Sequence, residues 1–97
     1  MEAKLTQTAE VSCINKNDRY SPYERIERIG GRAGGGWTLP LDDAIRKIES
    51  KDWAFYVSRN GQTVWIVVAT NNGRKYLKTE ADGAEPNNLL SLPECPR

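Results

Sequence analysis

The chain has 97 residues, with 14 basic and 13 acidic side chains and a formal net charge of +1. This length suits one domain whose single core folds without a metal or a dense disulfide framework. The balanced charge gives no general reason to expect binding to nucleic acid or to an anionic membrane. No apolar run approaches the roughly 20 residues of a membrane span, and the first residues lack the apolar core of a signal peptide. We therefore expect a cytoplasmic monomer without a membrane segment.

The first part of the chain contains two weak strand patterns. Residues 1–9 are polar and lack any period, which predicts a loose leader. The alternating segment Glu10–Asn15 predicts a first strand. A second strand is predicted over Tyr23–Ile29. Because Ile26 and Ile29 are spaced too unevenly for simple alternation, we expect them to straddle a β-bulge.

A glycine-rich segment, Gly30–Gly36, follows these strands and holds five of the chain's eight glycines. We expect no regular structure there. Backbone N–H groups of such a loop can bind phosphate ahead of a helix. A Walker-type loop, however, continues with Lys and then Ser or Thr, whereas Trp37 and Thr38 follow here. The composition favours a flexible connector over a phosphate site. A surface loop of this kind could still close over a bound ligand.

Residues Pro40–Ser50 have the pattern of an amphipathic helix. Proline suits the first turn, and apolar residues recur at helical spacing at Leu41, Ala44, Ile45 and Ile48. The acidic residues precede the basic ones, in the order that the helix dipole favours. Because Leu39 is not a capping residue, we expect Thr38 to cap the helix from one position earlier.

The strongest strand pattern is the segment Trp53–Ala69, which predicts a β-hairpin. Its two runs of aromatic and β-branched residues are separated by Asn60–Gly61, a pair suited to a two-residue type I′ turn. A second turn at Asn72–Gly73 leads to a third predicted strand over Arg74–Thr79. Together these strands form a meander whose register is set by its turns.

The register divides the side chains of the meander between two faces. With Arg59 opposite Gln62, face one carries Trp53, Phe55, Val57, Val64, Ile66, Val68, Leu77 and Thr79. Face two carries Ala54, Tyr56, Ser58, Thr63, Trp65, Val67, Tyr76 and Lys78. The strand Val64–Ala69 is apolar on both faces, which is typical of a central strand and means that each face needs a cover.

These elements predict one α+β domain over residues 10–97. It consists of a small antiparallel sheet of about five strands, with the central meander at 53–79, packed on one helix at 40–50. We expect the helix to cover face one. In one interpretation the acidic tail covers face two, with its charges near Lys78 and its leucines on the sheet: Leu89, Leu90 and Leu92. In the other, face two is open to a partner. A curled, partly closed SH3-like barrel is the alternative architecture.

The tail carries the most specific motif. It reads Tyr76-Leu-Lys-Thr-Glu-Ala-Asp82, then Asn87-Asn-Leu-Leu90 and Leu92-Pro-Glu-Cys95. Together with Gly36-Trp37 before the helix and the strand Phe55-Tyr56-Val57, this motif resembles the small bacterial domain-of-unknown-function family 3892 over nearly the whole chain. The resemblance implies one compact domain. It supplies no activity, ligand or catalytic residue, so no site can be transferred from it.

The two cysteines and the acidic residues of the tail give little support for a metal or a cofactor. Cys13 and Cys95 are far apart and form no Cys-x-x-Cys motif. An intracellular chain normally keeps its thiols reduced, so we favour free thiols over a disulfide, which would require the two ends of the chain to meet. The residues Glu80, Asp82 and Glu85 lack the spacing of an EF-hand loop. We expect no metal and no cofactor.

The residues also give little support for an enzyme. The chain has no histidine, hence no side chain whose unperturbed pKa suits proton transfer near neutrality. Asp42 and Asp43 are adjacent on the predicted helix and point to different sides, so they cannot flank a bond. A cysteine that acted as a nucleophile would lack the imidazole base that usually deprotonates it. We expect no enzymatic activity and assign no catalytic residue.

Face two supplies the candidate binding surface. Its aromatic residues lie beside Lys78 and near basic residues at a turn, giving the set Tyr56, Trp65, Tyr76, Lys78, Arg74 and Lys75. Stacking rings and cations are how small β-domains hold single-stranded nucleic acid. The balanced charge instead favours the interpretation that the aromatic residues of face two belong to the core. A third possibility is that an exposed edge strand pairs with a protein partner. We expect a non-enzymatic binding or interaction module, with single-stranded nucleic acid as the specific alternative.

Overall fold

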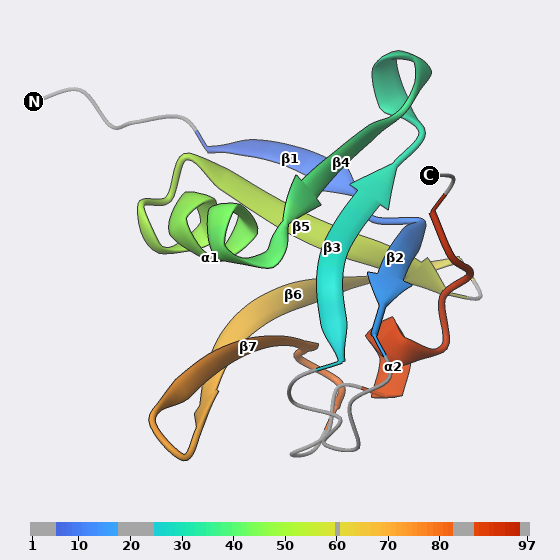
Figure 1. The fold of residues 1–97 in the computed structure, drawn as a ribbon. Helices are drawn as coiled ribbons and strands as arrows, with labels where there is room; N and C mark the ends of the chain where they lie inside the picture. Colours follow the sequence, from blue (N-terminus) through green and yellow to red (C-terminus); the bar gives the residue numbers. More distant parts are fainter. Residues whose placement is uncertain (1–5, 18–24, 60, 83–86, 96–97) are drawn as a thin grey trace, which may run out of the picture.

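The computed structural model describes residues 6–17, 25–59, 61–82 and 87–95, and shows two β-sheets with one main helix (Figure 1). The four-stranded sheet has the order β1-β5-β6-β7, formed by β1 (Gln7–Glu10), β5 (Trp53–Arg59), β6 (Gln62–Asn71) and β7 (Arg74–Thr79). The antiparallel three-stranded sheet has the order β2-β3-β4, formed by β2 (Cys13–Lys16), β3 (Ile26–Gly31) and β4 (Trp37–Pro40). The α+β class is confirmed. The single sheet of about five strands is wrong, and the described strands form no closed barrel.

The meander has the predicted register. Arg59 pairs with Gln62 across the β5–β6 hairpin, and Leu77 of β7 pairs with Val68 of β6. Asn60 of the predicted first turn lies outside the described residues, while Gly61 has the positive φ that the turn requires, at 78°. The division of side chains between face one and face two therefore holds along this part of the sheet.

The N-terminal strand differs from the expectation. Residues 7–10, most of which fall in the predicted leader, form β1, which pairs in parallel with β5. Val11 and Ser12 then carry the chain from one sheet to the other. The N–H of Val11 donates to the carbonyl of Tyr56 at 2.7 Å, and the N–H of Ser12 donates to the carbonyl of Gly30 at 2.9 Å. The alternation of residues 10–15 does not reveal this corner, so the predicted single strand is in fact two.

The bulge in the second predicted strand is confirmed. Asn15 pairs with Arg28 and Lys16 pairs with Ile26, which leaves Glu27 as the extra residue. This extra residue turns both Ile26 and Ile29 toward the core, where both are buried. Tyr23, the predicted first residue of this strand, lies outside the described residues.

The glycine-rich segment is partly regular, against the expectation. Gly30 and Gly31 end β3, and a short 3₁₀ turn, η2 (Ala33–Gly35), leads into β4. A Cβ on Gly30 would lie 2.7 Å from Sγ of Cys95, and one on Gly31 would lie 2.4 Å from the carbonyl oxygen of Glu10. These two glycines therefore serve close packing between strands.

The predicted helix is confirmed as α1 (Leu41–Glu49). Its N-cap is Pro40, and no side chain makes a capping hydrogen bond, so Thr38 is not the cap. Ala44 and Ile45 are buried in the same core as the face-one residues, as expected for a helix that covers face one. Glu49 near its end pairs with Lys75 of β7, with 2.8 Å between Oε2 and Nζ.

The described part of the C-terminal tail lies on the core, and the expectation that its leucines cover face two is wrong. It contains α2 (Asn87–Leu90), and Leu89 is 0% exposed within one cluster of buried residues: Val11, Ile14, Ile26, Ile29, Ala44, Ile45, Phe55, Val57, Ile66, Leu77 and Leu89. Asp82 Oδ2 accepts hydrogen bonds from the N–H and the hydroxyl of Thr79, and Asn88 Nδ2 donates to Thr79 Oγ1 at 2.8 Å. Because Thr79 is on face one, these bonds hold the tail at the core side of the sheet.

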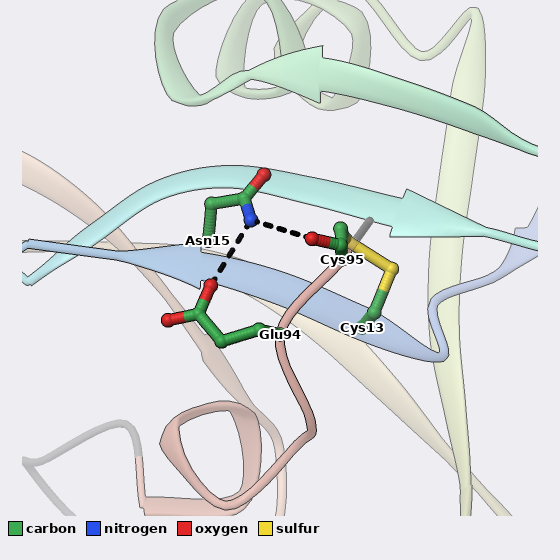
Figure 2. Close-up of a disulfide and its surroundings, with 4 residues drawn as sticks. All are labelled: Cys13, Asn15, Glu94 and Cys95. Atoms are coloured by element: carbon green, nitrogen blue, oxygen red, sulfur yellow. Dashed lines mark hydrogen bonds between the residues drawn. A yellow bond between two sulfur atoms is a disulfide. The ribbon is translucent and has the colours of Figure 1, made fainter. Parts of the chain in front are cut away.

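The tail ends in a disulfide, so the expectation of free thiols is wrong. Cys13 and Cys95 are bonded with their Cα atoms 4.9 Å apart (Figure 2). Ile14 brings the two ends together, because its N–H donates to Pro93 and its carbonyl accepts from Cys95. The buried Asn15 side chain donates to Glu94 Oε2 at 3.0 Å and to the Cys95 carbonyl at 3.1 Å. Among the described helices, none has the length and apolar character needed to cross a membrane.

Candidate functional site: an aromatic groove between two sheets

A groove of about 680 Å³ lies between the four-stranded sheet and β4. Residues of β1 and β5 line one side and residues of β4 line the other. Arg32, directly after β3, and Lys47 of α1 also line it. Arg32 precedes β4 in the chain and Lys47 follows it, so the two basic residues come from the segments on either side of this strand.

Three aromatic rings form the apolar wall of the groove. The ring centroid of Phe55 lies 5.6 Å from that of Trp37 and 6.1 Å from that of Trp53, whose ring is nearly parallel to it. Phe55 is 1% exposed, whereas both tryptophans are only half-buried. Trp53 and Phe55 belong to face one, so the groove opens onto the side of the meander that the sequence predicts to be closed by the helix.

The charged residues of the groove have no partners within the described part of the chain. Arg32 is exposed and Lys47 is half-buried, and neither side chain makes a hydrogen bond or an ion pair there. The same is true of the exposed Glu10 of β1. Two cations and one anion leave the groove with an excess of one positive charge, beside an apolar wall that raises the strength of electrostatic interactions.

The predicted surface on face two is only partly assembled. Trp65 is 37% exposed, and the ring of Tyr56 packs against it edge to face at 5.5 Å between centroids. Lys78 is half-buried next to Val67, whereas Tyr76 is 5% exposed and belongs to the buried set.

The two basic residues of the predicted set that lie near the turn, Arg74 and Lys75, project to different faces. Arg74 is exposed at the turn end of β7. Lys75 projects to face one, since it is two residues from Leu77 in the strand, and it pairs with Glu49 of α1 there. The structure therefore brings together Tyr56 and Trp65, with Lys78 on the same face, and removes Lys75 from that surface.

The groove was missed because two of its strands were not predicted. β1 lies mostly in the expected leader, and β4 begins directly after glycines interpreted as a connector. The available sequence pattern is the apolar–polar–apolar alternation of Trp37, Thr38 and Leu39. Without the neighbouring strands, this pattern is too short to indicate a site.

Two sheets, one main helix and a groove with an aromatic wall define a small α+β domain. Residues 10–93 match the family model described as "Protein of unknown function (DUF3892)", and the chain belongs to this family. The resemblance shown by the tail motif is thereby confirmed. No curated protein and no solved structure matches the chain.

Proposed function

We propose that this domain is a non-enzymatic binding module and that its ligand lies in the aromatic groove. The observation that carries the proposal is the combination of half-buried Trp37 and Trp53 with two cations, Arg32 and Lys47, whose side chains have no partner among the described residues. An apolar concave site with a few convergent polar groups is the usual form of a binding pocket. The ligand that fits combines an aromatic or aliphatic group with negative charge.

The non-enzymatic part of the proposal is supported by the chemistry of the side chains. The chain has no histidine, and its two cysteines are joined in the disulfide. Asp43 pairs with Arg46 on the helix surface, and Asp82 accepts hydrogen bonds from Thr79. The monomeric state and the absence of a cofactor stay predictions from the sequence.

The three tryptophans allow the groove to be tested in one NMR experiment. Trp37 and Trp53 line the groove, whereas Trp65 is on face two, so their indole N–H resonances report on the two surfaces separately. We expect anionic probes with an apolar group, namely phenyl phosphate and short acidic peptides with a central phenylalanine, to shift the resonances of Trp37 and Trp53 and leave that of Trp65 in place.

A charge-reversed variant supplies the control for this experiment. Arg32→Glu combined with Lys47→Glu should weaken the binding of these probes by about tenfold, because two attractive charges become repulsive. Arg28→Glu changes an exposed arginine of β3 that lies outside the groove and has no side-chain partner in the described ranges, so it should leave binding unchanged. If no probe moves the Trp37 and Trp53 resonances at millimolar concentration, the groove is not the binding site.

Single-stranded nucleic acid bound by face two is the second candidate. It is favoured by one observation, the exposed ring of Trp65 beside Tyr56 and Lys78. The burial of Tyr76 reduces the stacking surface from the three predicted rings to two. A short oligonucleotide would stack on Trp65 and place a phosphate near Lys78.

Replacement of Trp65 tests this second candidate. Since base–aromatic stacking contributes roughly 1 to 3 kcal/mol per base, Trp65→Ala should weaken binding of a fluorescent oligothymidine at least about fivefold, and Trp65→Phe should retain most of it. Fluorescence anisotropy at low salt measures the affinity, which should fall as salt is added. Absence of wild-type binding at low salt would remove nucleic acid from consideration.

A further inference from the structure

The groove is bordered by the free edges of both sheets. β1 is one edge strand of the four-stranded sheet and β4 is one edge strand of the three-stranded sheet. Residues of both strands line the groove. An edge strand presents backbone donors and acceptors that no neighbouring strand uses, and these can pair with another chain. The groove therefore offers backbone groups as well as an aromatic wall.

The hydrogen bonds of β1 show which of its backbone groups face the groove. The N–H groups of Gln7 and Val11 donate to the carbonyls of Asp52 and Tyr56 on the β5 side, at 3.1 and 2.7 Å. Because alternate residues of a strand direct their backbone groups to opposite edges, Thr8 and Glu10 direct their N–H groups away from β5. Neither group has a partner in the described part of the chain.

The hydrogen bonds of β3 show which backbone groups of β4 face the groove, and the last residue of β3 closes one end of the groove. The N–H of Ser12 donates to Gly30, so Gly30 makes its hydrogen bonds toward β2. Its β4 partner Thr38 consequently directs its own backbone groups away from β3, toward the groove that Thr38 lines. Gly31 closes one end of the groove, since it packs so closely against the carbonyl oxygen of Glu10 that a Cβ would not fit between them. At about 3.3 Å per residue, β1 offers an edge of about 13 Å, the length of a short extended peptide.

We propose that the groove binds an extended peptide segment of a partner protein, which adds as a strand to the free edge of β1. An aromatic or large aliphatic side chain of the peptide packs on Trp37 and Trp53, and acidic side chains lie beside Arg32 and Lys47. The positive excess of the groove selects acidic peptides, and the backbone donors of Thr8 and Glu10 select extended ones. This inference rests on the proposed binding function of the groove and adds the chemical class of the ligand.

A matched pair of variants at Thr8 tests the strand addition. Proline at this position removes the N–H that faces the groove and leaves the hydrogen bonds to β5 intact, since edge strands tolerate proline where the N–H points outward. The probe is the peptide acetyl-Asp-Val-Phe-Val-Asp-amide, titrated into ¹⁵N-labelled protein. We expect Thr8→Pro to weaken its binding roughly threefold to tenfold, the effect of one hydrogen bond. Thr8→Val keeps the N–H and should weaken binding distinctly less than Thr8→Pro does.

Two measurements on the unmodified protein keep the test independent of how Thr8→Pro folds. The same peptide N-methylated at its valines and phenylalanine keeps every side chain and loses the backbone N–H groups of its three central residues. It should bind at least tenfold more weakly. In the complex with the parent peptide, the amides of Thr8 and Glu10 should become protected from hydrogen exchange.

The outcomes separate this inference from the proposed function. If the N-methylated peptide binds as tightly as its parent, side chains alone hold the ligand, and strand addition is wrong while the groove remains the site. If only phenyl phosphate shifts Trp37 and Trp53, the ligand is a small anion and the peptide is excluded. If the two amides become protected with rising protein concentration and no peptide, a second copy of this chain occupies the edge in place of a partner. If no probe shifts the two tryptophans, the proposed function fails as well.

Discussion

Reduction of the Cys13–Cys95 disulfide is expected to lower the free energy of unfolding by about 4 kcal/mol. The bond joins residues 82 positions apart, so it closes nearly the whole chain into one loop. In the chain-entropy account, the stabilisation rises from about 3 kcal/mol for a 15-residue loop to about 4.7 kcal/mol for a 100-residue loop. A total stability of roughly 5 to 15 kcal/mol is usual for a small domain, so this loss is a large fraction of it.

The reduced protein should nevertheless fold, because the tail has other attachments. Leu89 is buried in the core, and Ile14 makes backbone hydrogen bonds to Pro93 and Cys95. Denaturant unfolding of the oxidised protein, of the same protein in dithiothreitol and of Cys95→Ala measures the difference. Alkylation followed by mass spectrometry is the control: we expect no reactive thiol before reduction and two afterwards. Two reactive thiols without reductant, or equal stabilities, would contradict the prediction.

The disulfide also bears on the predicted cytoplasmic location. Disulfides persist in oxidising compartments and are rare where glutathione and thioredoxin keep thiols reduced. The location stays a prediction, and the reduction potential of the Cys13–Cys95 pair tests it. A potential below about −300 mV is typical of structural bonds in secreted proteins, whereas a higher value would favour the reduced form in the cytoplasm.

The elements that could be predicted from the sequence are those fixed by nearby residues. The hairpin turn sets the pairing of Arg59 with Gln62 without any help from distant segments, and the second turn does the same for β7. The helix follows from its own apolar spacing. The bulge at Glu27 is also local, since uneven spacing of Ile26 and Ile29 in the chain indicates it directly.

The features that were missed depend on contacts between segments far apart in the chain. Gly30 was interpreted as part of a flexible connector, because the sequence does not show that both disulfide sulfurs lie against it. The parallel pairing of β1 with β5 joins residues separated by 46 positions, as in the pair Gln7–Trp53. The groove requires both of these arrangements. For this reason the sequence predicts Trp53 and Phe55 to lie beneath the helix, gives no position for Trp37, and indicates a candidate site on face two.

Leu89→Ala is expected to destabilise the domain by about 2 to 5 kcal/mol, the range for removing a fully buried leucine side chain. Leu89 is 0% exposed among core residues of both sheets, so its truncation leaves a cavity that rigid neighbouring strands cannot fill. Leu92→Ala is the matched control. Leu92 is in the same tail but only half-buried, and its truncation should cost distinctly less.

Quenching of tryptophan fluorescence separates the observed position of the tail from the one first expected. If the tail covered face two, loosening it would expose Trp65 to a neutral quencher such as acrylamide. Trp65 is already 37% exposed, while Leu89 is in the core. We therefore expect Leu89→Ala to change the quenching of Trp65 little under native conditions. The measurement uses a Trp37→Phe, Trp53→Phe background, with and without the Leu89 change. A marked rise in Trp65 quenching, or equal stabilities of the Leu89 and Leu92 variants, would place the tail over face two and return Tyr56 and Trp65 to the core.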